Sequence, residues 1–368
     1  MGTLILQDGT VYKGQSFGAL GGFEGEVVFN TSMVGYQEIL SDPNYAKQIL
    51  VMTYPEIGNY GVNDFDFESD NTHLVGLIVK NNCQQESHYK SRESLSNFLK
   101  KKNIIALSNI DTRSLVKKLT QMGTMSGFIT SNDLDSEYIN EKLGELQSFK
   151  IKEDILAEVS CKSRFAYNPQ GKINIAIYDY GIKKGILNAL ALRNCRITVY
   201  PYNTEAKEIL ENDFDAVFLS NGPGNPANYT YQIAQIKQLM GKIPLFGIGL
   251  GCQLLALASG AKTYKLKYGH RGSNHPVINL ENNKVVMTAQ NHGYAIDLEN
   301  ITKFMRPTHK NLNDDTLEGF EITSLGVYAI QFQPEGKPGP NDAEFIFDEW
   351  VNIIKKDINR INEVKKER

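Results

Sequence analysis

Cysteine is scarce in this sequence, and its placement excludes two kinds of site. The 368 residues include four cysteines, Cys83, Cys161, Cys195 and Cys252, with no C-x-x-C pair and no histidines grouped at metal-ligand spacing. Disulfide scaffolds and structural zinc sites both depend on such spacings. We therefore expect a reduced, cytoplasmic protein with no disulfide and no metal site.

Strong charge and long apolar runs are also absent. The formal net charge is −3, which argues against nucleic acid or a membrane surface as a partner. No apolar run approaches the roughly 18 residues of a membrane-spanning helix, and the N-terminus lacks the pattern of a signal peptide. The apolar content of 41% is that of a soluble globular protein, and the length suffices for two domains.

The first half of the chain has the pattern of short strands, turns and a few helices. Asp8-Gly9 lies between alternating apolar residues and predicts a hairpin. The apolar pattern predicts further strands at 27–30 and 74–80 and helices over 91–102 and 112–122. A polar stretch follows and ends in a turn at 168–171. We predict a first domain at 1–150, a linker at 151–171, a second domain at 172–358 and a charged tail at 359–368.

The second half alternates apolar strands with helices. This alternation predicts an α/β domain with a mostly parallel sheet and helices on both faces. Ligands bind such sheets at the carboxyl ends of the strands. Two unusual turns, at 220–226 and after 248, follow strands at that edge. The predicted strands are 173–178, 197–200, 216–219 and 243–248; the predicted helices are 183–193, 205–211 and 229–240, with another whose buried face includes Ile346, Trp350 and Ile354.

The second of these turns has the pattern of a nucleophile elbow. An apolar strand enters the glycine-rich sequence Gly247-Ile-Gly-Leu-Gly-Cys-Gln253, and a helix is expected to start near Cys252. An elbow presents one side chain at a strained turn, beside backbone N–H groups that hold an oxyanion. Here that position is Gly249, which has no side chain. Glycine adopts the positive φ of such a turn without steric cost.

Further motifs give the chain a specific resemblance. Gly222-Pro-Gly224 precedes the elbow and Gln290-Asn-His-Gly293 follows it. Over nearly its full length the chain resembles the small, glutamine-hydrolysing subunit of carbamoyl phosphate synthetase. The resemblance implies an α/β fold, with an N-terminal α+β domain peculiar to that subunit followed by a class I glutamine amidotransferase domain. The N-terminal resemblance rests on Phe29-Asn-Thr-Ser-Met-Val-Gly-Tyr-Gln-Glu38, Thr53-Tyr-Pro-Glu-Ile-Gly-Asn59 and Asn109-Ile-Asp-Thr-Arg113.

The family's catalytic triad is incomplete in this chain. Family members carry a Cys nucleophile at the elbow, a His base and a Glu that orients the His. By resemblance, the nucleophile position is Gly249, the base position is Gln333 and only Glu335 of the triad remains. A neutral amide cannot accept and return a proton near pH 7 as imidazole does. We therefore expect glutamine hydrolysis to be lost.

Most positions of the family's glutamine-binding shell are retained. Tyr294 stands where the family usually has Phe, and Asn44 stands where many members have Ser. These residues either still bind glutamine or persist as turn and packing residues. By resemblance, the shell is Asn44, Gly222, Gly224, Leu250, Gln253, Asn291, Gly293 and Tyr294, while His270, His275 and His292 match family positions other than the base.

The resemblance also implies a partner and leaves alternatives. The small subunit of this family docks on a large subunit, which uses bicarbonate, ATP and Mg²⁺; no cofactor is expected in this chain. The leading hypothesis is a heterodimer that makes carbamoyl phosphate for arginine or pyrimidine synthesis from ammonium. One alternative is an active glutaminase that uses Cys252. The other is a module that binds glutamine to regulate a partner.

Overall fold

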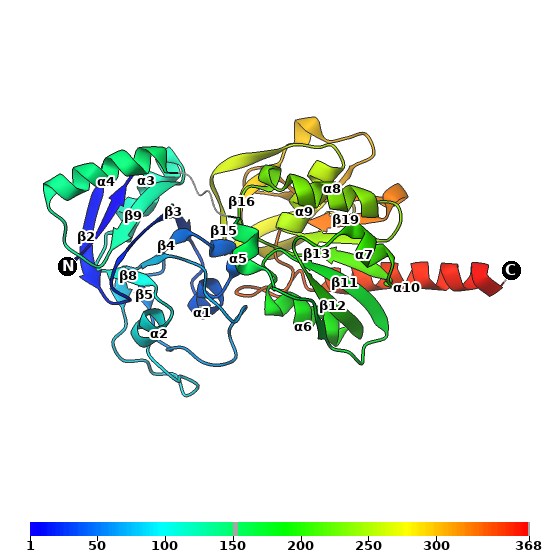
Figure 1. The fold of residues 1–368 in the computed structure, drawn as a ribbon, viewed down its shortest axis with the longest axis horizontal. Helices are drawn as coiled ribbons and strands as arrows, with labels where there is room; N and C mark the ends of the chain where they lie inside the picture. Colours follow the sequence, from blue (N-terminus) through cyan, green and yellow to red (C-terminus); the bar gives the residue numbers. More distant parts are fainter. Residues whose placement is uncertain (150–153, 367–368) are drawn as a thin grey trace. The chain divides into compact units, whose positions relative to one another are not determined.

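The computed structural model describes residues 1–149 and 154–366. These residues divide into two compact units (Figure 1). The first unit contains Met1–Ile155 and Lys267–Gly272, and the second contains Leu156–Leu266 and Ser273–Arg368. Among the helices in the described ranges, none combines the length and apolar content needed to cross a membrane.

The first unit is built on a closed barrel of seven strands in the order β1-β2-β8-β6-β4-β3-β9. The hairpin predicted from Asp8-Gly9 joins β1 to β2: Gly9 has a φ of 88°, and Ile5 pairs with Val11. A separate pair, β5 with β7, is parallel. The strands are β1 (Gly2–Leu6), β2 (Val11–Ser16), β3 (Gly22–Asn30), β4 (Gln48–Met52), β5 (Glu56–Ile57), β6 (Gly76–Ile78), β7 (Asn81–Asn82), β8 (Ile105–Ser108) and β9 (Met125–Thr130).

The helices of the first unit pack on opposite sides of these strands, because successive side chains of a strand point to opposite faces. Val28 and Leu50 share a core with α1 and α2, whereas their neighbours Val27 and Ile49 share one with α3. α3 has its predicted bounds, but α2 begins later than predicted, after the N-cap residue Ser94. The helices are α1 (Tyr36–Leu40), α2 (Leu95–Lys101), α3 (Thr112–Met122) and α4 (Ser136–Ser148).

The second unit contains a ten-stranded sheet in the order β10-β12-β11-β13-β14-β19-β18-β17-β15-β16. Its centre, from β12 to β19, is parallel as predicted. Beyond β19 the sheet continues with antiparallel pairs: β18 pairs with β19, β17 with β18, and β15 with β17. These pairs were not predicted from the sequence. The strands are β10 (Phe165–Tyr167), β11 (Ile173–Asp179), β12 (Cys195–Pro201), β13 (Ala216–Leu219), β14 (Leu245–Ile248), β15 (Thr263–Asn279), β16 (Val285–Ile296), β17 (Arg306–Asn311), β18 (Leu317–Ile322) and β19 (Val327–Ile330).

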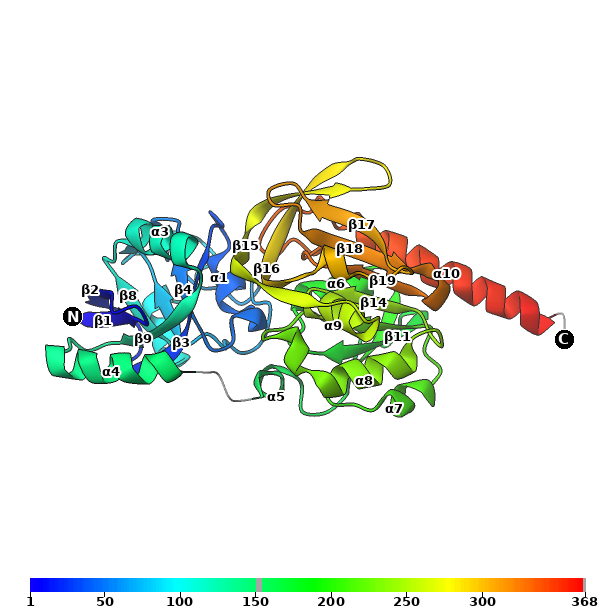
Figure 2. The same cartoon turned by 90° about the horizontal axis from the view of Figure 1, so that it is seen from above.

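Helices cover both faces of this sheet (Figure 2). Alternate residues of β13 divide between two cores: Val217 packs with α7, α8 and α9, and Phe218 packs with α6 and α10. This arrangement confirms the predicted α/β class with helices on either side. The helices are α6 (Lys184–Leu192), α7 (Ala206–Leu210), α8 (Thr230–Leu239), α9 (Leu250–Ala258) and α10 (Phe345–Lys366).

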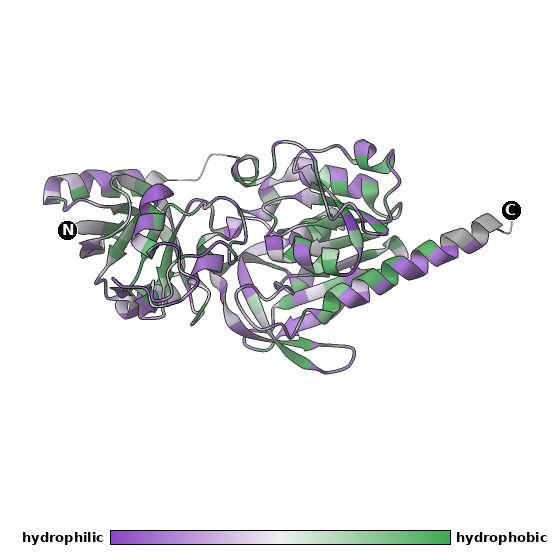
Figure 3. Cartoon of the chain, turned by 90° about the horizontal axis from the view of Figure 1, so that it is seen from below, coloured by the Kyte–Doolittle hydropathy of each residue, from purple (hydrophilic) through white to green (hydrophobic). Residues whose placement is uncertain are grey.

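The two stretches expected to lie outside the domains carry regular structure where they are described. Of the predicted linker at 151–171, residues 151–153 lie outside the described residues, and the remainder contains α5 (Ile155–Val159) and β10. β10 pairs with β12, so it is an edge strand of the sheet. The predicted charged tail at 359–368 continues α10 through Lys366, and 367–368 are not described. Figure 3 shows hydrophobic and hydrophilic residues alternating along this helix.

Candidate active site

Four loops follow adjacent parallel strands of the second unit and lie at the carboxyl edge of its sheet. The strands are β11, β13, β14 and β19, which pair in parallel register. Carboxyl ends of parallel strands are where α/β sheets bind their ligands. The three positions of the expected triad, Gly249, Gln333 and Glu335, lie on the loops after β14 and β19.

Gly249 forms the turn between β14 and α9, as the elbow motif predicts. Its φ of 58° and ψ of −111° are costly for any residue with a Cβ. A Cβ added at Gly249 would lie 3.4 Å from the Cβ of Asn221 and 3.9 Å from the carbonyl oxygen of Gln331. Both are ordinary contact distances. The buried turn therefore has room for a small side chain and strains the backbone of any residue that supplies one.

The helix after the elbow begins at Leu250, two residues earlier than predicted. Gly251 permits its close approach to β13, because a Cβ there would lie 2.1 Å from the carbonyl oxygen of Leu219. The N–H of Gly251 donates to the carbonyl of Ser220 at 3.0 Å. The N–H of Leu250 is in the first turn, where a helix supplies no carbonyl acceptor. It is the donor that this geometry offers to an oxyanion.

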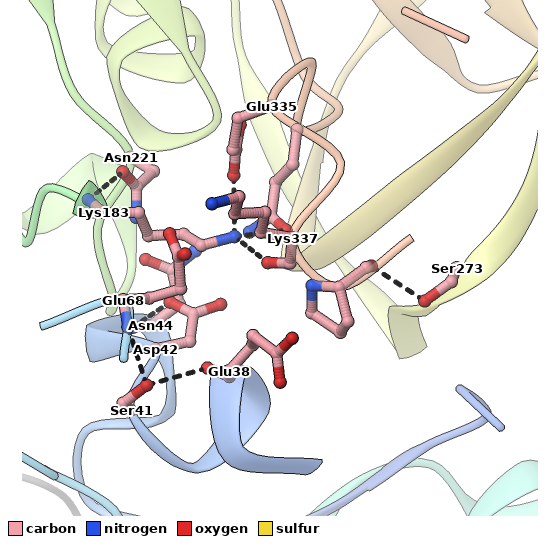
Figure 4. A network of polar contacts seen from close by, with 12 residues as sticks. Glu38, Ser41, Asp42, Asn44, Glu68, Lys183, Asn221, Ser273, Glu335 and Lys337 are labelled. Atoms are coloured by element: carbon pink, nitrogen blue, oxygen red, sulfur yellow. Dashed lines mark hydrogen bonds and ion pairs between the residues drawn. The ribbon is translucent and has the colours of Figure 1, made fainter. Parts of the chain in front are cut away.

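A buried lysine contacts the other two triad positions, and Figure 4 shows it beside Glu335. Nζ of Lys183 lies 2.6 Å from Oε1 of Glu335 and 3.2 Å from Oε1 of Gln333. It also donates to the carbonyl of Lys337. The side chains of Lys183 and Glu335 are 0% and 1% exposed. Since a buried charge is costly unless it is paired and hydrogen-bonded, each charge depends on the other.

The loop that carries this lysine is fixed by Asp179 at the end of β11. One carboxylate oxygen accepts the N–H groups of Gly181 and Ile182, at 2.9 and 2.8 Å, and the other accepts the N–H of Cys161 at 2.7 Å. Burial raises the pKa of Asp179 although all three donors favour its charged form. Asp179 thus sets the course of the chain between the strand and α6.

The expected glutamine-binding residues are distributed over both units. Asn44 lies in the first unit, in the short 3-10 helix Pro43–Tyr45, where its N–H donates to Oδ1 of Asp42 at 2.9 Å. The others belong to the second unit: Gly222 and Gly224 in the loop after β13, Leu250 and Gln253 on α9, and Asn291, Gly293 and Tyr294 on β16.

Gln253 uses its amide group within the protein. Its Nε2 donates to the carbonyl of Tyr294 at 2.8 Å and to Oε1 of Gln331 at 3.0 Å. The side chain is buried. Gln253 therefore ties α9 to β16 and to the loop after β19, which are the elements that surround the elbow.

Cys252 and His292 are both buried residues of the second unit. Cys252 is fully buried on α9, and this burial, with the charge of Glu318 nearby, raises the pKa of its thiol well above the ordinary value. His292 lies on β16, with Nε2 3.0 Å from Oε1 of Gln290 and Nδ1 2.8 Å from the carbonyl of Tyr294. His270 and His275, likewise not expected to act as the base, lie on β15.

Both parts of the chain match known families. Residues 176–353 match "Glutamine amidotransferase class-I", and residues 4–129 match "Carbamoyl-phosphate synthase small chain, CPSase domain". A carbamoyl phosphate synthase small chain of Syntrophotalea carbinolica is 44% identical over 96% of this chain and 97% of its own. The pyrimidine-specific small chain of Bacillus subtilis is 45% identical over 95% of each chain.

The parallel sheet, the elbow and the family match define the second unit as a class I glutamine amidotransferase domain. The N-terminal match and the full-length relatives then fix the family. This chain belongs to the carbamoyl-phosphate synthase small chain family. The predicted resemblance is thereby confirmed.

Lys183 was not among the expected site residues. The spacing predicted a helix that starts at Lys183 and gave this lysine no other role. In the structure, α6 begins at Lys184 and Lys183 precedes the helix. The sequence does carry a usable signal. Asp179-Tyr-Gly-Ile-Lys183 directly follows a buried strand, at the same sheet edge as the two unusual turns. A lysine in that place lies beside the same loops that carry the triad positions.

Proposed function

We propose that this chain is the small subunit of a carbamoyl phosphate synthetase and that it does not hydrolyse glutamine. The observation that carries the proposal is the elbow, where Gly249 offers no group that could attack an amide. Removing the nucleophile from a comparable hydrolase costs up to about a millionfold in rate. Gln333 at the base position adds a second, independent loss.

The proposed complex uses free ammonium as its nitrogen source. The partner is a large subunit that binds ATP and Mg²⁺ and consumes bicarbonate, while this chain holds no cofactor and braces the assembly. Relatives of similar length are named as small chains, which supports such a partner. One is named pyrimidine-specific, which favours pyrimidine over arginine synthesis as the destination. We place the complex in the cytoplasm.

The decisive experiment mixes the chain with its cognate large subunit. Glutamate release from glutamine and carbamoyl phosphate formation from ammonium are measured in parallel. We expect carbamoyl phosphate from ammonium and no glutamate above background. Equal rates of carbamoyl phosphate formation with both donors would disprove the proposal.

An active glutaminase that uses Cys252 is the weaker alternative, because its thiol is buried and its pKa is raised. Under this alternative, Cys252→Ala would abolish glutamate release. Under our proposal, Cys252→Ala leaves the background unchanged. A glutamine-sensing module is tested separately by calorimetry at millimolar glutamine, where the absence of heat contradicts sensing.

A further inference from the structure

Three oxygen atoms from a single segment of chain lie at the ammonium of Lys183. Its ammonium has three N–H bonds. Oε1 of Glu335, Oε1 of Gln333 and the carbonyl oxygen of Lys337 accept from it, and all three belong to residues 333–337. Figure 4 shows Lys183 with Glu335 and Lys337. We call these three oxygens the oxygen cage. The cage joins the loop after β11, which carries Lys183, to the loop after β19.

We propose that Gln333 and Glu335 now serve as ligands of the Lys183 ammonium, and that this internal cation holds the 333–337 segment at the sheet edge. The proposal rests on the proposed function in taking positions 333 and 335 as released from their roles in the triad. It gives the remaining triad residue a task that needs no nucleophile. Lys183 is thus a positioning residue.

The chemistry of position 333 agrees with this role. An amide oxygen is an uncharged acceptor and accepts from the ammonium at 3.2 Å. An imidazole in the same place would become a second cation on protonation, next to Lys183. Glutamine therefore supplies what a lysine-centred cage requires, in addition to lacking what catalysis requires.

The first test compares a single and a double variant of the full chain. Lys183→Met leaves the Glu335 carboxylate buried without a cation, and we expect the unfolding temperature to fall by about 10 °C. Adding Glu335→Gln removes the second charge and should recover part of that loss. Lys207→Met is the control, because Lys207 is an exposed lysine with only a surface partner, Glu211. It should shift the midpoint little.

The second test is chemical rescue. Lys183→Ala removes the equivalent of n-propylammonium, so that ion should raise the unfolding temperature of Lys183→Ala and leave the unsubstituted chain unchanged. 1-Propanol has the same length without charge, and sodium chloride matches the ionic strength; neither should rescue. Rescue by the cation alone separates a cage for an ammonium from a general packing role.

Three outcomes would overturn the proposal. The first is a fall in unfolding temperature for Lys183→Met no greater than that for Lys207→Met. The second is a Lys183→Met/Glu335→Gln chain that is no more stable than Lys183→Met or fails to fold. The third is equal rescue by 1-propanol. If Lys183→Met alone fails to fold while the double variant folds, the proposal is supported. Glutamate release is assayed in the same samples. Release from the unsubstituted chain would disprove the proposed function and would leave the comparison of unfolding temperatures valid.

Discussion

At the scale of single residues, the proposed loss of glutamine hydrolysis depends on positions 249 and 333. The space at Gly249 admits a Cβ at ordinary contact distances, and the Glu at position 335 is still present. We therefore expect Gly249→Cys combined with Gln333→His to create measurable glutamate release. The contribution of the base should make this variant about 100-fold or more faster than Gly249→Cys alone.

The control for this reversal is Gly249→Ala, which adds a Cβ but no thiol. It should release no glutamate and should lose about 1–3 kcal/mol of unfolding free energy, because alanine is strained at a φ of 58°. A double variant that binds glutamine and still releases no glutamate would show that the scaffold has changed beyond the two side chains.

His309 on β17 gives the second unit a defined sensitivity to acid. Burial lowers the pKa of His309 from 6.5 to about 4, and its ring meets the edge of Phe332. Between these two pH values the unfolded chain binds a proton that the folded chain does not. Stability is therefore unaffected by His309 above about pH 7 and falls as the pH drops through 6.5 toward 4.

The expected size of this effect is about 2 kcal/mol between pH 7 and pH 5. His309→Gln removes the titrating group. Its unfolding free energy, measured by urea, should therefore fall less between pH 7 and pH 5 than that of the unsubstituted chain. The difference between the two losses should equal this amount. Parallel losses in the two proteins would contradict the assignment.

At the scale of elements, the turn after β11 depends on one carboxylate. Asp179→Ala leaves the N–H groups of Gly181, Ile182 and Cys161 without their acceptor, and we expect a loss of about 3 kcal/mol. Asp179→Asn keeps one carbonyl oxygen for Gly181 and Ile182 and should lose less. Urea unfolding measures the free energy of unfolding of both variants. Equal losses would contradict the prediction, because the oxygen that asparagine retains would then contribute nothing to stability.

The sequence predicted those elements whose pattern is local. β11, β13 and α3 are uniform apolar or amphipathic runs with clear ends, and the structure has them within one residue of the prediction. Strands β15 to β18 were missed because polar residues and glycine interrupt their apolar pattern. β10 was missed because a short edge strand is mostly exposed and resembles a polar linker.

The same division applies to the candidate site. The elbow could be predicted because strand, glycine turn and helix are consecutive in the sequence. The oxygen cage could not, because Lys183 and Gln333 are 150 positions apart and meet only through the order of strands in the sheet. The sequence therefore indicated the expected triad positions Gly249 and Gln333, whose loss of function stays a prediction, and the structure was needed to find what Glu335 contacts.

At the scale of the whole assembly, the proposed function determines the source of the nitrogen in carbamoyl phosphate. A working small subunit supplies ammonia from glutamine directly to its partner, so glutamine nitrogen enters the product even when ammonium is in solution. Under the proposal, this chain provides no such supply. Given ¹⁵N-ammonium and unlabelled glutamine together, the complex should form carbamoyl phosphate that carries ¹⁵N at the enrichment of the ammonium, as measured by mass spectrometry.

The matched control is the same large subunit with the Gly249→Cys/Gln333→His chain, whose product should be diluted by unlabelled nitrogen in proportion to its glutamate release. Because both complexes contain the same synthetase sites, any difference in labelling arises at the elbow. If the unsubstituted chain also gives diluted product, a nucleophile other than residue 249 is at work, and its position must then be sought by trapping the acyl intermediate. If labelling is undiluted in both, the elbow geometry is insufficient for attack even with a thiol, and the loss of function extends to the surrounding loops.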